Sequence, residues 1–160
     1  MNRKSDPVNK TVKGNKEKYL SYKEAFARIK LAKSEGFYLE AITIQESIIT
    51  DRLISYFHGT NKIIIRNEKE AHKKYSFHRL IELLEQEKSI DSGLCKSLMK
   101  WKDDRNKCLH RIAKSFPGNP TQNIDEFLNH AKNTADKGDG LVRKILVWHK
   151  KMQNFNNLNT

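Results

Sequence analysis

Apolar residues recur at spacings of three and four along most of the chain, which is the pattern of an α-helix with one buried face. Few helix-breaking residues interrupt it, since the 160 residues include seven glycines and three prolines. Five stretches carry the pattern, with apolar positions over Tyr22–Ala32, Leu39–Tyr56, Phe77–Leu84, Leu94–Ile112 and Ile124–Ile145. We therefore predict an all-α fold, an antiparallel bundle of about five helices in one domain over residues 19–153.

Residues typical of helix ends set the expected bounds: Ser21 with Glu24, Gly36, Ser76, Ser89 or Asp91, and Asn123 with Glu126. The second helix is expected from about Tyr38 to Phe57 and the fourth from about Asp91 to Ser115, where Phe116–Pro120 ends it. The last helix is expected to continue through Gly138, with small residues where another helix approaches. A break at Gly138–Gly140 is the alternative.

Three stretches lack a helical apolar period. Residues 1–18 are expected to form a mobile basic tail, either a solvated end or an arm that contacts phosphate. Residues 59–75 are expected to form a long loop, which includes the short apolar run Ile63-Ile64-Ile65. Residues 154–160 are expected to be a frayed polar C-terminus.

The apolar positions of each predicted helix form a stripe along its buried face. In two of the helices one position of this stripe holds a charged residue instead of an apolar one. In the second helix this residue is Glu46, and in the fourth it is Arg105. A buried charge needs a partner, so the two side chains are expected to face each other. Such a pair either serves only to hold the two helices together, or Glu46 also orients the Arg105 guanidinium towards a groove. Glu46 at the rim of its stripe is a third interpretation.

The formal net charge of +12 favours a polyanionic partner. Nucleic acid is favoured over a membrane, because no stretch is apolar enough to insert. The alternative is that the basic surface serves solubility alone. The N-terminal residues are charged and polar, without the apolar segment of a signal peptide, so a cytoplasmic location is expected.

The composition gives no support for a metal or another cofactor. None of the six histidines forms an i,i+4 pair of the kind that ligates a metal on a helix, and no glycine-rich phosphate loop is present. Cys95 and Cys108 are 13 positions apart on one helix, roughly 20 Å along its axis, too far for a disulfide. Trp101 and Trp148 are expected in the core or in a dimer interface.

The fourth predicted helix contains the run Arg105-Asn106-Lys107-Cys108-Leu109-His110. This run resembles the signature of the HEPN superfamily, in which an Arg, often followed by a polar residue such as Asn, precedes a His by four to six positions. The resemblance covers six residues as a motif and roughly Tyr19 to His149 as an architecture. It implies a small helical bundle, usually dimeric, of a group that includes many metal-independent endoribonucleases of toxin–antitoxin and phage-defence systems.

Metal-free RNA cleavage needs a base for the 2′-hydroxyl proton, an acid for the leaving oxygen and cations at the phosphate. The resemblance implies that His110 is the acid or base, that Arg105 stabilises the phosphate and that Asn106 orients either group; Glu46 is expected to position Arg105. One chain offers a single motif histidine, and Arg105 and His110 differ by roughly 140° around a helix. A two-fold homodimer that joins two motif faces in one cleft answers both difficulties.

The sequence departs from one branch of the family. In HEPN toxins paired with nucleotidyltransferase antitoxins, a Tyr typically follows the motif His by two positions, and Ile112 stands there in this chain. Regulation through that Tyr is not supported, although an antitoxin or another partner protein remains compatible with the resemblance. Two alternatives to an RNA-cleaving enzyme stay open: a noncatalytic nucleic-acid-binding helical domain and a helical protein-interaction module.

Overall fold

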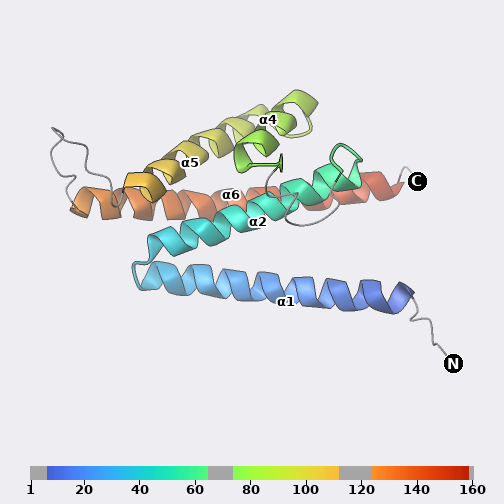
Figure 1. The fold of residues 1–160 in the computed structure, drawn as a ribbon, viewed down its shortest axis with the longest axis horizontal. Coiled ribbons are helices and arrows are strands. Elements are labelled where there is room, and N and C mark those ends of the chain that lie inside the picture. Colours follow the sequence, from blue (N-terminus) through green and yellow to red (C-terminus); the bar gives the residue numbers. More distant parts are fainter. Residues whose placement is uncertain (1–6, 65–73, 112–123, 159–160) are drawn as a thin grey trace.

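The protein is a bundle of helices in the computed structural model, which describes residues 7–64, 74–111 and 124–158 (Figure 1). These residues contain no strand and form five helices: α1 (Pro7–Ser34), α2 (Tyr38–Gly59), α4 (Phe77–Glu87), α5 (Ser92–Arg111) and α6 (Ile124–Leu158). The expected all-α bundle of about five helices is confirmed.

Helices α2 and α6 form the middle of the bundle, with α1 on one side and α4 and α5 on the other (Figure 1). Helices α1 and α2 are antiparallel, as are α5 and α6. The central helices α2 and α6 run in the same direction, since Gln45 bonds to Ala135 and Tyr56 packs on Trp148. This parallel pair was not expected from an antiparallel bundle. It places α1 and the motif helix α5 on opposite sides of the α2–α6 layer.

The core follows the apolar stripes closely in α4 and α5. The four predicted apolar residues of α4 are all buried: Phe77, Leu80, Ile81 and Leu84. The Oγ of Ser76 accepts a hydrogen bond from the backbone N–H of Arg79 at 3.3 Å, as a helix N-cap does. Trp101 is 2% exposed and Trp148 is 7% exposed, which confirms both as core residues.

Two expected helix ends are wrong. Helix α1 begins at Pro7 rather than at Ser21, and α6 continues to Leu158 rather than fraying from residue 154. A proline suits the first turn of a helix, whose N–H groups have no intrahelical partner. The side chains of residues 16–20 are exposed, so this part of α1 has no buried face that an apolar period could reveal. Gly36, with φ +79°, follows α1 in the left-handed conformation that the sequence predicted.

Part of the expected loop 59–75 is described. Ile63 is buried and Ile64 is 71% exposed, so this apolar run divides between core and surface. Residues 65–73, the stop at Phe116–Pro120, Ile112 and the expected cap at Asn123 lie outside the described residues. Ile124, expected on the inner face of the last helix, is 62% exposed.

Helix α6 is continuous through Gly138–Gly140, so the alternative of a break there is wrong. Gly138 lies against Gln45, which is fully buried on α2. The Nε2 of Gln45 donates hydrogen bonds of 2.7 Å to the carbonyl oxygen of Ala135 and to Oδ1 of Asp139. The small residue at position 138 thus permits a close approach of α2, as expected.

Replacing Gly138 with alanine is expected to lower the free energy of unfolding by about 2 kcal/mol. A Cβ at this position would stand 2.0 Å from Oε1 and 2.6 Å from Cδ of Gln45, so the amide must move and lose its hydrogen bonds. This loss exceeds the gain of about 1 kcal/mol in helix propensity. Urea denaturation measures the change, and Gly140→Ala, where nothing lies within 4 Å of the added Cβ, is the matched control. A Gly138→Ala protein as stable as Gly140→Ala would contradict the close approach.

Candidate functional site

The charged residues that interrupt the stripes of α2 and α5 meet between these helices. The Nη2 of Arg105 forms an ion pair with Oε1 of Glu46. Their side chains are 17% and 19% exposed, so both charges lie largely out of solvent. The prediction that Glu46 and Arg105 face each other is confirmed.

Asn106 completes this cluster on the α5 side. Its Oδ1 accepts a hydrogen bond from Nη1 of Arg105, while the buried Nε of Arg105 has no partner among the described residues. Burial lowers the pKa of Arg105. A guanidinium stays charged despite such a shift, so Glu46 and Asn106 hold a cation in a fixed orientation through its two terminal nitrogens. The side chain of Arg105 is only 17% exposed and its Nε is fully buried, so a phosphate oxygen can meet the guanidinium only at the small part that solvent reaches.

His110 lies apart from this cluster within one chain. It is exposed near the end of the described part of α5 and forms no hydrogen bond or ion pair with Glu46, Arg105 or Asn106. Five residues separate it from Arg105, roughly 140° around the helix. The structure therefore brings together three of the four predicted site residues.

Asp104 lies at the same place and was not predicted from the sequence. Its spacing of three from Trp101 and four from Cys108 puts it on the apolar stripe, and it is 9% exposed, less than its neighbour Arg105. Its Oδ2 lies 3.7 Å from Nζ of Lys137 on α6. The stripe thus has two charged residues at this turn: Asp104, which faces α6, and Arg105, which faces α2.

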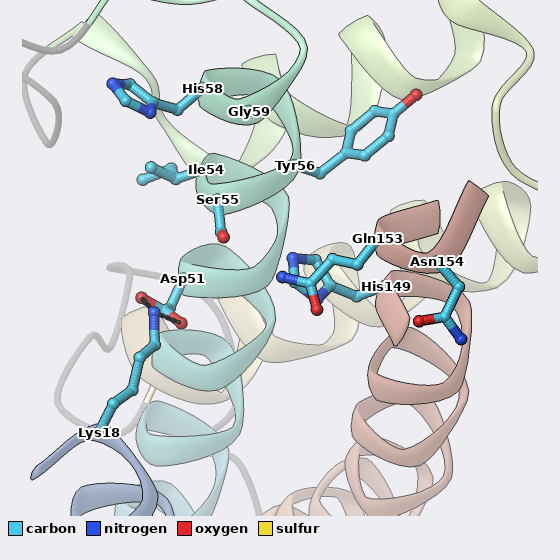
Figure 2. Close-up of a pocket in the computed structure, with 10 residues that line it drawn as sticks. All are labelled: Lys18, Asp51, Ile54, Ser55, Tyr56, His58, Gly59, His149, Gln153 and Asn154. Carbon is cyan, nitrogen blue, oxygen red and sulfur yellow. Dashed lines mark hydrogen bonds and ion pairs between the residues drawn. The ribbon is translucent and has the colours of Figure 1, made fainter. Parts of the chain in front are cut away.

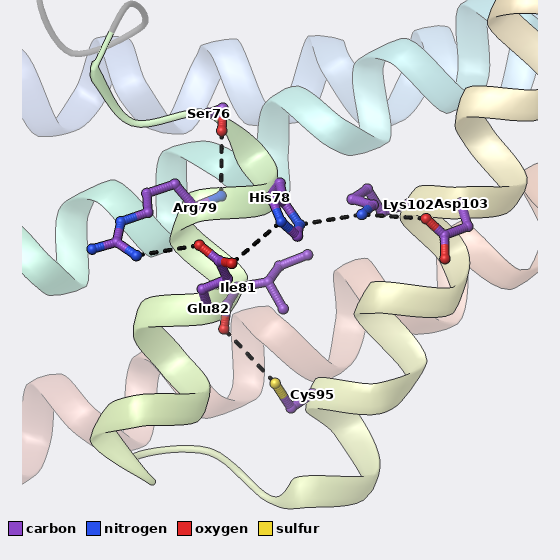
Figure 3. Close-up of polar contacts among 8 residues, drawn as sticks. All are labelled: Ser76, His78, Arg79, Ile81, Glu82, Cys95, Lys102 and Asp103. Carbon is purple, nitrogen blue, oxygen red and sulfur yellow. Dashed lines mark hydrogen bonds and ion pairs between the residues drawn. The ribbon is translucent and has the colours of Figure 1, made fainter.

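A second histidine takes part in a chain of polar contacts on the surface of α4 and α5 (Figure 3). The Nζ of Lys102 lies 3.2 Å from Nδ1 of His78, and Nε2 of His78 lies 3.3 Å from Glu82. An ammonium can only donate, so Nδ1 accepts and the ring proton lies on Nε2, facing the carboxylate. All three groups are thereby engaged with one another, and we assign them a structural role between the two helices.

A further polar cluster joins α1 to α2 around Asp51. The hydroxyl of Tyr22 donates to Oδ2 of Asp51 at 2.6 Å, and Nζ of Lys18 lies 3.2 Å from the carboxylate. Arg52 donates to the Tyr22 hydroxyl at 2.5 Å and also pairs with Asp51 at 2.8 Å. Burial would raise the pKa of Asp51, but the Tyr22 hydrogen bond and the charges of Lys18 and Arg52 hold it below its usual value. Burial and the neighbouring Asp51 raise the pKa of Tyr22.

His149 of α6 lies beside this cluster and is 3% exposed. Burial lowers the pKa of His149 from its ordinary value of 6.5, and the positive charges of Arg52 and Lys18 lower it further. The imidazole is therefore neutral at neutral pH. No sequence pattern singled it out, because its position next to Trp148 is typical of a core residue.

The lowered pKa of His149 predicts a loss of stability in acid. When the pH falls below 6.5, the unfolded chain binds a proton that the folded chain takes up only at lower pH, so the free energy of unfolding decreases. We expect a steeper decrease from about pH 7.5 to about pH 5 in the native protein than in His149→Leu. Urea denaturation across this range measures both slopes. Equal slopes would show that His149 has the same pKa folded and unfolded.

The described residues contain no group of three or more His, Cys, Asp or Glu side chains placed to hold a metal ion. Cys95 and Cys108 are buried free thiols. None of the helices in the described ranges is both long and apolar enough to cross a membrane. No protein-family model matches the chain, and neither the curated proteins nor the solved structures include a match to it.

Proposed function

We propose that this protein is a metal-independent endoribonuclease of the HEPN type that acts as a toxin or phage-defence effector. The observation that supports the proposal is the cluster of Glu46, Arg105 and Asn106, in which two partners hold the charged guanidinium of the motif arginine in one orientation. His110 lies little more than one helical turn further along α5 and is open to solvent, where a substrate can reach it.

The proposed reaction is the attack of an RNA 2′-hydroxyl oxygen on the adjacent phosphorus. A neutral His110 takes the hydroxyl proton, the new P–O bond closes a 2′,3′-cyclic phosphate, and the P–O5′ bond breaks. A second, protonated His110 gives its proton to the departing 5′-oxygen, so proton uptake and release balance. Arg105 stabilises the charge that develops on the non-bridging phosphate oxygens.

This mechanism requires two copies of His110, and we therefore propose a two-fold homodimer that joins the motif faces. Arg105 pairs with Glu46 of α2 while His110 is exposed and forms no hydrogen bond with the cluster, which supports a site shared between two protomers. A symmetric contact brings a His110 from one protomer towards the Arg105 of the other. RNA is the proposed substrate and an antitoxin protein a proposed partner.

The test is incubation of the purified protein with structured RNA in an excess of EDTA. We expect fragments that end in a 2′,3′-cyclic phosphate, detected by mass spectrometry, and a solution mass of a dimer by light scattering. Intact RNA, or cleavage that EDTA abolishes, would contradict the proposal, and a monomeric mass would contradict the shared cleft.

The second candidate function is nucleic-acid binding without catalysis. The separation of His110 from the Arg105 cluster in one chain favours it. A basic helical domain of this kind would retain RNA in a salt-dependent manner, because bound lysines and arginines release counterions from the phosphates. Retention of uncut RNA, with an affinity that falls steeply with salt, is the result that would select this function over the first.

A further inference from the structure

A groove of about 790 Å³ lies between α1, α2 and α6 (Figure 2). Lys18 of α1, Asp51 and Ser55 of α2, and His149 and Gln153 of α6 contribute to its lining. Helix α5, with its motif, lies on the other side of the α2–α6 layer (Figure 1). The groove is therefore separate from the Arg105 cluster.

His149 is a buried polar residue in the lining of this groove. Its ring lies between α2 and α6 on the groove side (Figure 2) and makes no hydrogen bond within the described residues, although only 3% of the residue is exposed. Neither ring nitrogen of His149 is among the fully buried polar atoms that lack a partner, so an unbonded nitrogen of this ring is open to the groove. A neutral imidazole presents one donor and one acceptor, and a ligand in the groove can use both.

The charge around the groove favours an anion. Lys18 and Arg52 stand against the single carboxylate of Asp51, so this cluster has a surplus of one positive charge. A concave surface beside a surplus of positive charge concentrates anionic ligands.

The remaining lining suits a ligand larger than a bare anion. Ser55, Gln153 and Asn154 supply a hydroxyl and two amides, which both donate and accept hydrogen bonds. Ile54 and Tyr56 add apolar surface beside them. Hydroxyls, ring nitrogens and a flat apolar face occur together with a phosphate in a nucleotide.

We propose that this groove binds a nucleotide unit, with the phosphate at Lys18 and the sugar or base hydrogen-bonded to His149. The unit is either a free nucleotide or one residue of a polynucleotide strand, since both present the same chemistry here. The proposal does not depend on RNA cleavage at α5.

The test uses a fluorescent 2′-O-methyl hexauridylate as the probe and uridine 5′-monophosphate and inorganic phosphate as competitors. A 2′-O-methyl group blocks attack by the 2′-oxygen, so binding is measured whether or not the protein cleaves RNA. Fluorescence anisotropy gives the affinity. Histidine ring resonances of the native protein report on the site directly, with His149 assigned by its absence in a folded His149→Gln variant, so this readout does not require that His149→Leu or Lys18→Ala fold.

We expect the His149 resonances to shift on addition of the probe, and the affinity to fall about tenfold in His149→Leu and about threefold in Lys18→Ala. Lys96→Ala, which removes an exposed lysine from α5, is the matched control and should bind as the native protein does. Displacement of the probe by uridine monophosphate identifies a free-nucleotide site, and its absence identifies a strand site; each supports the proposal. Unmoved His149 resonances, equal affinities of the three variants, or equal effects of phosphate and uridine monophosphate would overturn it.

Discussion

Glu46→Ala is expected to lower the free energy of unfolding by about 2 kcal/mol, because it leaves the Arg105 guanidinium largely buried without its counter-charge. The side chain of Arg105 is 17% exposed and its Nε already lacks a partner, so the guanidinium has little access to water as a replacement. Urea denaturation at neutral pH measures the loss. Because both side chains are still partly exposed, the expected loss in free energy of unfolding is smaller than the loss for breaking a fully buried ion pair.

A double-mutant cycle separates the ion pair from the other effects of each substitution. Glu46→Leu with Arg105→Leu removes both charges and is expected to be more stable than either single variant, since no unpaired charge remains. Glu40→Ala is the matched control, because Glu40 is an exposed acid on the same helix. Additive losses in the cycle would show that Glu46 and Arg105 do not interact in solution.

This pair shows what the sequence can reveal about the site. An acid on one apolar stripe and a base on another are each unfavourable alone, and the rule that buried charges are paired predicts their contact. The same rule did not identify Asp104. Both Asp104 and Arg105 lie at helical spacing between Trp101 and Cys108, and Arg105 alone is predicted at the buried position between them. Asp104 is the more buried of the two, and its cationic neighbour, Lys137, belongs to a different helix.

The fold was predictable wherever a helix has a buried face. Helix α4 matches its expected cap and its four core residues, whereas α1 begins 14 residues before its expected start. A helix segment with exposed side chains carries no apolar period, and only backbone propensity then distinguishes it from a tail. The groove between α1, α2 and α6 could not be predicted from the sequence for a related reason. Its residues come from three helices, and the path of α1 beside Asp51 follows from packing that a local pattern does not encode.

RNA cleavage is expected to fall by about a thousandfold in His110→Ala, which removes the proposed acid and base, and by at least about a hundredfold in Arg105→Ala. Loss of activity in Arg105→Ala has two physical sources, since the substitution also leaves Glu46 as an unpaired buried acid. The Glu46→Leu and Arg105→Leu double variant removes this second source and should be equally inactive while folded. Lys107→Ala, an exposed cation within the same motif, should retain native activity. Cleavage is followed with a fluorescent RNA in EDTA, and folding by circular dichroism.

A mixing experiment then asks whether the catalytic groups of two protomers act together. Native protein and His110→Ala are combined in equal amounts, unfolded in urea and refolded together, so that dimers form at random. If one site needs two copies of His110, only native homodimers cleave, and activity falls to about one quarter of that of the same total amount of native protein. If each protomer carries a complete site, activity falls to about one half. We expect the quarter, because Arg105 pairs with Glu46 of α2 while His110 is exposed, and the proposed mechanism joins the arginine of one protomer to the histidine of the other.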